Sequence, residues 1–419
     1  MIQEVALAKK VTFYCGDRLI RLEVMAFGAD FTRVPYSNLH VNASARHWKS
    51  YLEYHSRVKD LIRWREEREP TAKLTSLLSL LAVPGGLFEA TRPEDKIFAL
   101  YGICRRLGYD LPAPDYQKPV AAVYTEAARA VLHYDQSLEL LSAAMESPAW
   151  ADGLPSWVPN FSGCMTKWST SNPPLLASIA ARESLKASGL GQSEFSLESN
   201  GTRLKVRGWK LDTICAVGKP WKMDSHTTLL GGAATNKLQF VETLIECIGS
   251  WFDVVVGRSS SYSGLALIEL MVHVLTNNLG DQFPAVPFED MVRSLAVLVT
   301  ISAPDNPMCS AILASLPNMR RSYDQEAMTA LLVQCFPAIT RIFGSLWQTM
   351  YRTNDGYLGM GTYTVTPGDM VVLFQGCATA GIIRPSNDGF KYVGPTYVDG
   401  IMGEGLWDSG PDRESFVLT

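Results

Sequence analysis

The clearest hydrophobic pattern of the chain lies between residues 90 and 116. Apolar residues recur there at helical spacing and form one face, namely Ile97, Leu100, Tyr101 and Cys104. Thr91 and Glu94 stand three residues apart, as in a capping box, and predict the start of a helix. Gly108 predicts its end in a left-handed turn. The pattern therefore predicts a core helix over Thr91–Arg106, followed by a proline-rich extended connector.

The same periodicity predicts further elements in the first part of the chain. The expected helices are Gln3–Lys9, Trp48–Ile62, Leu74–Leu81 and Val120–Tyr134. Pro119 is expected in the first turn of the last of these helices. Alternating stretches around Gly16-Asp17 predict a short hairpin of Val11–Cys15 and Leu19–Leu22. The apolar run Ser137–Ser142 predicts a buried strand, and the prolines on either side of Trp157 predict a rigid segment with buried aromatic residues.

Strand patterns become frequent in the second half. Asn200-Gly201 predicts a hairpin between Phe195–Glu198 and Leu204–Val206, which Trp209–Val217 extends. The expected helices are Lys237–Ile248, Leu265–Leu275, one short helix within Asp281–Asp305, and Ala327–Tyr351 with a kink at Pro337. The expected later strands are Val371–Phe374, Gly381–Arg384, Phe390–Val393 and Tyr397–Met402, with turns at Asp355-Gly356, Pro367-Gly368 and Asn387-Asp388-Gly389.

These elements predict an α+β protein. Residues 1–164 are expected to form a mostly helical region with a short hairpin. Residues 165–194, rich in Ser, Ala, Pro and Gly, read as a loop, linker or insertion. Residues 195–419 are expected to form a mixed helix and strand region that ends in a small antiparallel β-rich segment at about 355–405.

Composition narrows the class of protein. Hydrophobic residues make up 47% and charged residues 19% of the chain, which is typical of a globular protein. The formal net charge of −4 argues against a nucleic-acid partner. No stretch reaches the roughly 20 apolar residues of a membrane span, and the N-terminus lacks the pattern of a signal peptide. The 8 cysteines are scattered singly, which indicates reduced thiols and a cytoplasmic location.

Catalytic and ligand-binding motifs are absent from the sequence. It contains no Gly-x-Ser-x-Gly elbow and no phosphate-binding loop of the Walker type. His47 and His55 stand eight residues apart without a third ligand at metal-site spacing. We therefore predict no catalytic, cofactor-binding or metal-ligating residue and no cofactor. These absences favour a protein that is not an enzyme.

Two groups of charged residues are candidates for docking a neighbouring loop or a protein partner. Arg92, Asp95 and Lys96 cluster at the start of the predicted core helix, where the alternative for Asp95 and Lys96 is an acid–base site in a cleft. Arg384 and Asp399 lie in the β-rich end, facing each other or a partner; the plainer interpretation is a surface ion pair worth less than about 1 kcal/mol.

Several blocks of the sequence resemble the fungal heterokaryon-incompatibility (HET) family. Residues 2–17 look like the tail of the HET domain and the hairpin after it. The run Thr91–Gly102 resembles the T-x-P-x-D-K-x-[YF]-A-L-x-G block of the region that follows that domain. Further similar blocks occur in family order, namely Pro114-Asp115-Tyr116 with Val123-Tyr124, Leu154–Pro159, Pro367-Gly368-Asp369, Arg384-Pro385 and Gly394–Met402.

The resemblance implies a regulatory or partner-sensing region of a non-self recognition protein, whose relatives trigger growth arrest or cell death. This role implies unidentified protein partners and no catalysis. The A-L-S-Y-x-W-G and W-I-D-x-x-C-I-N-Q blocks of the HET domain itself do not occur in the sequence. We therefore expect a region downstream of a missing HET domain. An enzyme whose site is assembled from distant residues, or a non-functional truncated gene product, remains as the alternative; the oligomeric state stays open.

Overall fold

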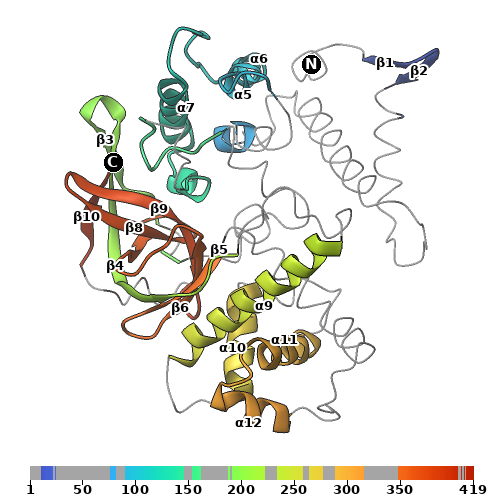
Figure 1. Cartoon of the computed structure of the whole chain (residues 1–419). Coiled ribbons are helices and arrows are strands. Elements are labelled where there is room, and N and C mark those ends of the chain that lie inside the picture. Colours follow the sequence, from blue (N-terminus) through green and yellow to red (C-terminus); the bar gives the residue numbers. More distant parts are fainter. Residues whose placement is uncertain are drawn as a thin grey trace. The chain divides into compact units, whose positions relative to one another are not determined.

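The structure, a computed structural model, describes most of the chain in separate stretches. They are residues 11–21, 24, 76–81, 90–145, 153–161, 187–188, 191–221, 234–257, 264–276, 288–315, 348–403, 407, 410 and 412–419. The chain divides into two compact units (Figure 1). The first contains residues 1–136, 147–154 and 158–170, and the second contains residues 137–146, 155–157 and 171–419. Helices accompany an antiparallel sheet, which confirms the α+β class.

The first unit begins with the predicted hairpin. Strands β1 (Thr12–Cys15) and β2 (Arg18–Arg21) pair antiparallel across Gly16 and Asp17. Gly16 has a φ of 62°, a value that L side chains adopt rarely and glycine adopts freely, so the tight turn follows from the sequence.

The predicted core helix is divided into two short helices, α5 (Asp95–Phe98) and α6 (Tyr101–Arg106). The prediction of a capping box formed by Thr91 and Glu94 is wrong. Glu94 is the N-cap of α5 without a side-chain capping bond, because its carboxylate binds the guanidinium of Arg92 instead of reaching back. The predicted end at Gly108 is confirmed. Gly108 has a φ of 89°, and the N–H groups of Gly108 and Tyr109 bond to Arg105 and Cys104, the pattern of a Schellman motif.

The predicted helix after the connector is confirmed as α7 (Val120–Asp135), with Pro119 at its N-cap, one position before the expected first turn. The carboxylate of Asp135 at its C-terminal end accepts the main-chain N–H groups of Leu77 and Leu78 at 2.8 and 3.0 Å. These are N–H groups at the start of the helical residues 77–81, which have no partner within their own helix. Asp135 therefore joins two helices of this unit.

The first element of the second unit differs from its prediction. Residues Leu138–Ser142, predicted as a strand, form the 3-10 helix η2. The hydroxyl of Ser137 accepts the N–H of Glu139 at 3.1 Å, and this local bond favours a turn over an extended chain. Leu138, Leu140 and Leu141 are nevertheless buried, as the apolar run indicated. Hydrophobicity alone did not distinguish the two conformations.

The main feature of the second unit is an 8-stranded sheet. Its strands are β3 (Phe195–Glu198), β4 (Arg203–Val217), β5 (Gln348–Thr353), β6 (Leu358–Thr362), β7 (Met370–Phe374), β8 (Ala380–Ser386), β9 (Gly389–Val398) and β10 (Glu414–Leu418). Neighbours follow the order β4–β5–β6–β9–β8–β7, and β7 also pairs with β4. The sheet therefore closes on itself as a barrel (Figure 1).

Strand β4 makes the closure possible because it pairs along both of its edges. One edge bonds β3 and then β7, and the other bonds β10 and then β5. Register shifts after Lys210 and after Ile214 mark bulges, which bend a strand and increase its twist. Gly208 of β4 lies close to β7, because an added Cβ there would lie 2.7 Å from the carbonyl oxygen of Leu373.

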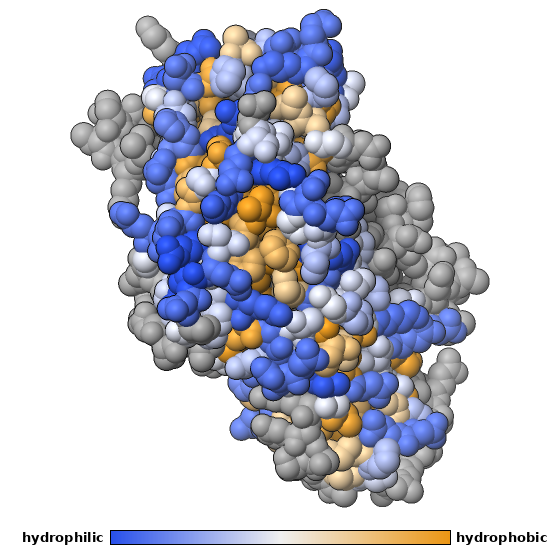
Figure 2. Space-filling model, turned by 90° about the vertical axis from the view of Figure 1, so that its left-hand side faces the viewer, coloured by the Kyte–Doolittle hydropathy of each residue, from blue (hydrophilic) through white to orange (hydrophobic). Residues whose placement is uncertain are grey.

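The barrel surface is mixed in polarity. Figure 2 views the molecule from the side on which β3, β4 and β10 are labelled in Figure 1, and hydrophobic residues gather in the middle of that face with hydrophilic ones around them.

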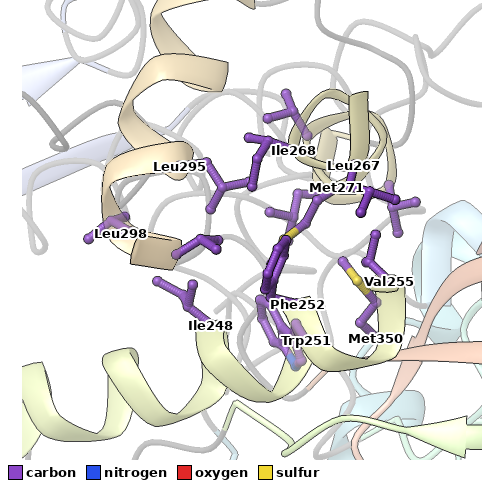
Figure 3. Close-up of a cluster of buried hydrophobic side chains, with 14 of the residues drawn as sticks. Ile248, Trp251, Phe252, Val255, Leu267, Ile268, Met271, Leu295, Leu298 and Met350 are labelled. Atoms are coloured by element: carbon purple, nitrogen blue, oxygen red, sulfur yellow. The ribbon is translucent and has the colours of Figure 1, made fainter. Parts of the chain in front are cut away.

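Helices are inserted between the neighbouring strands β4 and β5. They are α9 (Ala234–Val256), α10 (Gly264–Thr276), α11 (Phe288–Ser302) and α12 (Pro307–Ser315). Their apolar faces form one core, in which Figure 3 shows Trp251 and Phe252 of α9 together with Met271 of α10 and Met350 of β5. The ring N–H of Trp251 donates to the carbonyl of Lys219 at 2.9 Å. The helices are therefore anchored both to the chain after β4 and to β5.

Several predicted elements of the second unit are confirmed. The hairpin of β3 and β4, the strands β7 and β8, and the turns at Gly356 and Gly368 lie where expected. Phe390–Val393 and the start of Tyr397–Met402 belong to one longer strand, β9. The expected helix up to Tyr351 is wrong at its end, since Gln348–Thr353 is strand β5. Strands β6 and β10 and helix α12 were not predicted.

The expected helices Gln3–Lys9 and Trp48–Ile62, the kink at Pro337 and most of the expected linker 165–194 lie outside the described residues. The proposed domain limits stay a prediction.

The barrel interior is filled by side chains. Tyr351 of β5 is fully buried, and its hydroxyl is 2.7 Å from the hydroxyl of Thr396 on β9, which in turn donates to the carbonyl of Met360. Glycine gives the Tyr351 ring its space: a Cβ on Gly359 would overlap the phenol and lie 2.6 Å from the carbonyl oxygen of Tyr397.

We predict that Gly359→Ala destabilises the full chain by about 2 kcal/mol, because neither a buried ring nor a backbone carbonyl can move away cheaply. Gly403→Ala is the control, since a Cβ there meets nothing within 4 Å. Urea unfolding of both variants measures the difference, and equal midpoints would show that the interior is loosely packed.

Candidate functional site

The structure brings two of the predicted contact residues, Arg92 and Asp95, together around Tyr116. The guanidinium carbon of Arg92 lies 4.7 Å from the centre of the Tyr116 ring, a cation–π distance. The Tyr116 hydroxyl donates to the carboxylate of Asp95 at 2.8 Å. Phe98 packs its ring against the same tyrosine, edge to face, at 5.1 Å. We call Arg92, Glu94, Asp95 and Tyr116 the Arg92–Tyr116 cluster.

Glu94 fixes the arginine of this cluster. Its side chain is only 5% exposed, and it accepts the Nε–H of Arg92 at 2.9 Å with a second bond from the same guanidinium. A buried carboxylate needs a partner because water is unavailable to it. Arg92 itself remains 53% exposed. The cluster therefore presents a cation and an aromatic ring to solvent in a fixed arrangement.

Helix α7 supports the Arg92–Tyr116 cluster through Tyr124. The Tyr124 hydroxyl donates to the carbonyl of Pro93 at 2.8 Å, and Tyr124 is fully buried with its ring 5.4 Å from that of Phe161. Lys96, the third predicted residue, is 8% exposed, so its side chain is directed into the unit and is not part of the surface.

The Tyr116 phenol is perturbed by its hydrogen bond. The bond to Asp95 raises the pKa of Tyr116 above its ordinary value, because it stabilises the protonated phenol beside a carboxylate. Tyr116 was not among the predicted residues, although the Pro114-Asp115-Tyr116 block pointed to its neighbourhood.

Arg384 forms an ion pair with a buried carboxylate, and not the surface ion pair of the plainer interpretation. Its Nε and Nη2 bind both carboxylate oxygens of Asp369, at 2.7 and 2.9 Å, and Nη2 also donates to the carbonyl of Thr364. Asp369 is 1% exposed and accepts the N–H of Thr366 as well. This bidentate pair therefore fixes the turn between β6 and β7 onto β8.

Asp399 lies at the other end of the ladder that β8 forms with β9. The register pairs Arg384 with Lys391, and Asp399 follows the last residue of β9. Its N–H donates to the carbonyl of Leu358 at 2.9 Å. Burial raises the pKa of Tyr397, and the Asp399 carboxylate beside it raises that pKa further. Arg384 and Asp399 therefore belong to separate contacts.

The buried thiols are poor nucleophiles. Burial raises the pKa of Cys104 to about 12 and that of Cys247 to about 11. Among the described residues no three His, Cys, Asp or Glu side chains lie close enough together to hold a metal ion. No helix in the described part of the chain is long and apolar enough to cross a membrane.

Comparison with known proteins shows what the barrel resembles. Residues 329–419 match the family model of the Het-6 beta-barrel domain, a span that contains β5 to β10. This part of the chain is therefore similar to the Het-6 beta-barrel domain. It is also 22% identical over 373 residues to heterokaryon incompatibility protein 6, OR allele, of Neurospora crassa. The resemblance to the heterokaryon-incompatibility family is therefore confirmed.

The match covers 78% of this chain and 51% of the relative, so the chain spans about half the length of that protein. No solved structure matches the chain. The structure adds that the barrel of this chain also uses β4, which lies more than a hundred residues before the matched span.

We predict that Arg384→Ala destabilises the chain by about 3 kcal/mol, because it leaves the buried Asp369 carboxylate without its cation. Arg293→Ala is the matched control. Its partner Asp290 lies 3.4 Å away, but both side chains are about half exposed, so less than about 1 kcal/mol is expected. Chemical unfolding of both variants gives the comparison; similar losses would contradict a structural role for the Arg384 pair.

Proposed function

We propose that this chain is a non-catalytic, partner-sensing region of a heterokaryon-incompatibility system, and that it acts in the cytoplasm through protein contacts. Its similarity to heterokaryon incompatibility protein 6 supports a role in heterokaryon incompatibility. The observation that carries the contact mechanism is the Arg92–Tyr116 cluster, an exposed arginine and tyrosine held rigid by buried groups.

Arginine and tyrosine are the side chains that most often dominate binding energy at protein interfaces. A rigid pair loses little conformational entropy when a partner binds. The partner is expected to offer a carboxylate to Arg92 and an apolar or peptide surface to the ring of Tyr116.

The enzyme alternative has less support. The pKa values of the buried Cys104 and Cys247 are shifted away from the range of an activated nucleophile. Tyr351 and its neighbours occupy the barrel interior, where a ligand would otherwise enter. The function is therefore better placed on the surface.

We predict that expression of the chain in a filamentous fungus changes the frequency of cell death after fusion with an incompatible strain, scored with a vital dye. Tyr116→Ala and Arg92→Ala should return this frequency to the level of the empty vector, because they remove the exposed contacts. Arg105→Ala, an exposed arginine in the last turn of α6, should behave as the wild type.

Circular dichroism and thermal unfolding must first show that the variants are folded. A wild-type chain without effect contradicts the proposed function. Folded Tyr116 and Arg92 variants that act like the wild type contradict the use of this cluster.

A further inference from the structure

Strand β3 has an open edge that carries hydrogen-bonding groups. In the described part of the chain β3 pairs only with β4. The N–H of Arg207 bonds to the carbonyl of Glu194 at 3.1 Å, which sets the phase of the antiparallel ladder. Because the ladder alternates, Ser196 and Glu198 face β4, whereas Phe195 and Leu197 direct their N–H and C=O groups away from it.

The edge is accessible and rigid. Leu197 is 37% exposed, and Ser196 and Glu198 are exposed as well. The chain before β3 is tied down, since the hydroxyl of Ser193 accepts the N–H of Leu138 at 3.2 Å and the carbonyl of Gln192 accepts the amide of Gln375. A strand fixed in this way is already in the conformation that a pairing strand requires.

The charges on β3 select the kind of strand that fits. Glu194 and Glu198 project from the same face as Ser196 and are about half exposed. Their present partners, Arg207 at 3.3 Å and Lys205 at 4.0 Å, form exposed ion pairs of small value. A second copy of β3 would bring glutamates beside glutamates, which disfavours self-association. A basic strand would instead gain both carboxylates.

We propose that the outer edge of β3 is a docking site for an extended peptide segment whose basic residues alternate with apolar ones. The main-chain groups of Phe195 and Leu197 bond to the peptide backbone. The apolar residues of the peptide pack beside the side chains of Phe195 and Leu197, and its basic residues lie beside Glu194 and Glu198. This site is separate from the Arg92–Tyr116 cluster and does not rest on the proposed function.

The test uses a fluorescein-labelled peptide of alternating lysine and valine and fluorescence anisotropy with the full chain. Saturable binding is expected. Two N-methylated peptides, one methylated at the valines and one at the lysines, locate the amides that face β3. In a paired strand only every second N–H points to its neighbour, so one methylation pattern should weaken binding about tenfold and the other should not. Strand addition is overturned if both methylated peptides lose affinity equally, or if neither of them loses affinity.

Two variants and one matched control test the site itself. Leu197→Pro removes an outward N–H without removing a bond to β4 and should weaken binding about tenfold, whereas Leu197→Thr keeps that N–H. The double variant Glu194→Lys, Glu198→Lys should lose the lysine peptide and gain a peptide in which glutamate replaces lysine.

The charge exchange keeps the proposal testable if the proline variant does not fold. Absence of binding by the wild type, or binding that these variants leave unchanged, overturns the proposal. Its failure would leave the role of the Arg92–Tyr116 cluster intact, because the fusion assay does not depend on β3.

Discussion

The second unit depends on the two-sided pairing of β4. A closed sheet needs one strand that joins its first and last members, and β4 does so by bonding β7 along one edge and β5 along the other. Its two bulges and Gly208 let the strand bend and let β7 come close. Closure surrounds the buried Tyr351 with strands, and the pair of Arg384 with Asp369 fixes the turn before β7, a strand that β4 bonds.

Closure also fits the proposal that the function lies on the surface. The helices α9 to α12 share one core with Met350 of β5 and Met360 of β6. Under the proposed function, the protein offers a partner an outer arrangement of charge, aromatic rings and strand edges. The Arg92–Tyr116 cluster and the edge of β3 are two such surfaces, and each is held by buried contacts.

Local chemistry made part of this fold predictable. The turns at Gly16, Gly108, Gly356 and Gly368 have left-handed backbones, and glycine marks these positions in the sequence. Amphipathic helices such as α7 and α10 were likewise visible. The barrel was not, because the pairing of β4 with β5 joins residues that lie more than a hundred positions apart and leaves no local signal.

The site was predictable only in part, for the same reason. Arg92 and Asp95 were visible as a charged group, but their partner Tyr116 comes from beyond a proline-rich connector. The capping-box pattern of Glu94 was misleading, since a nearby arginine competed successfully for its carboxylate. The family blocks marked Asp369 and Arg384, yet only the structure shows that they form one buried pair.

The most direct test of this account is amide hydrogen exchange, followed by mass spectrometry, on the full chain. If β4 closes the barrel, the protected amides of residues 203–217 and those of residues 370–398 open together in one cooperative step. Much faster exchange in 203–217 than in 370–398 would show that the later strands are stable without β4, and would contradict the closed barrel.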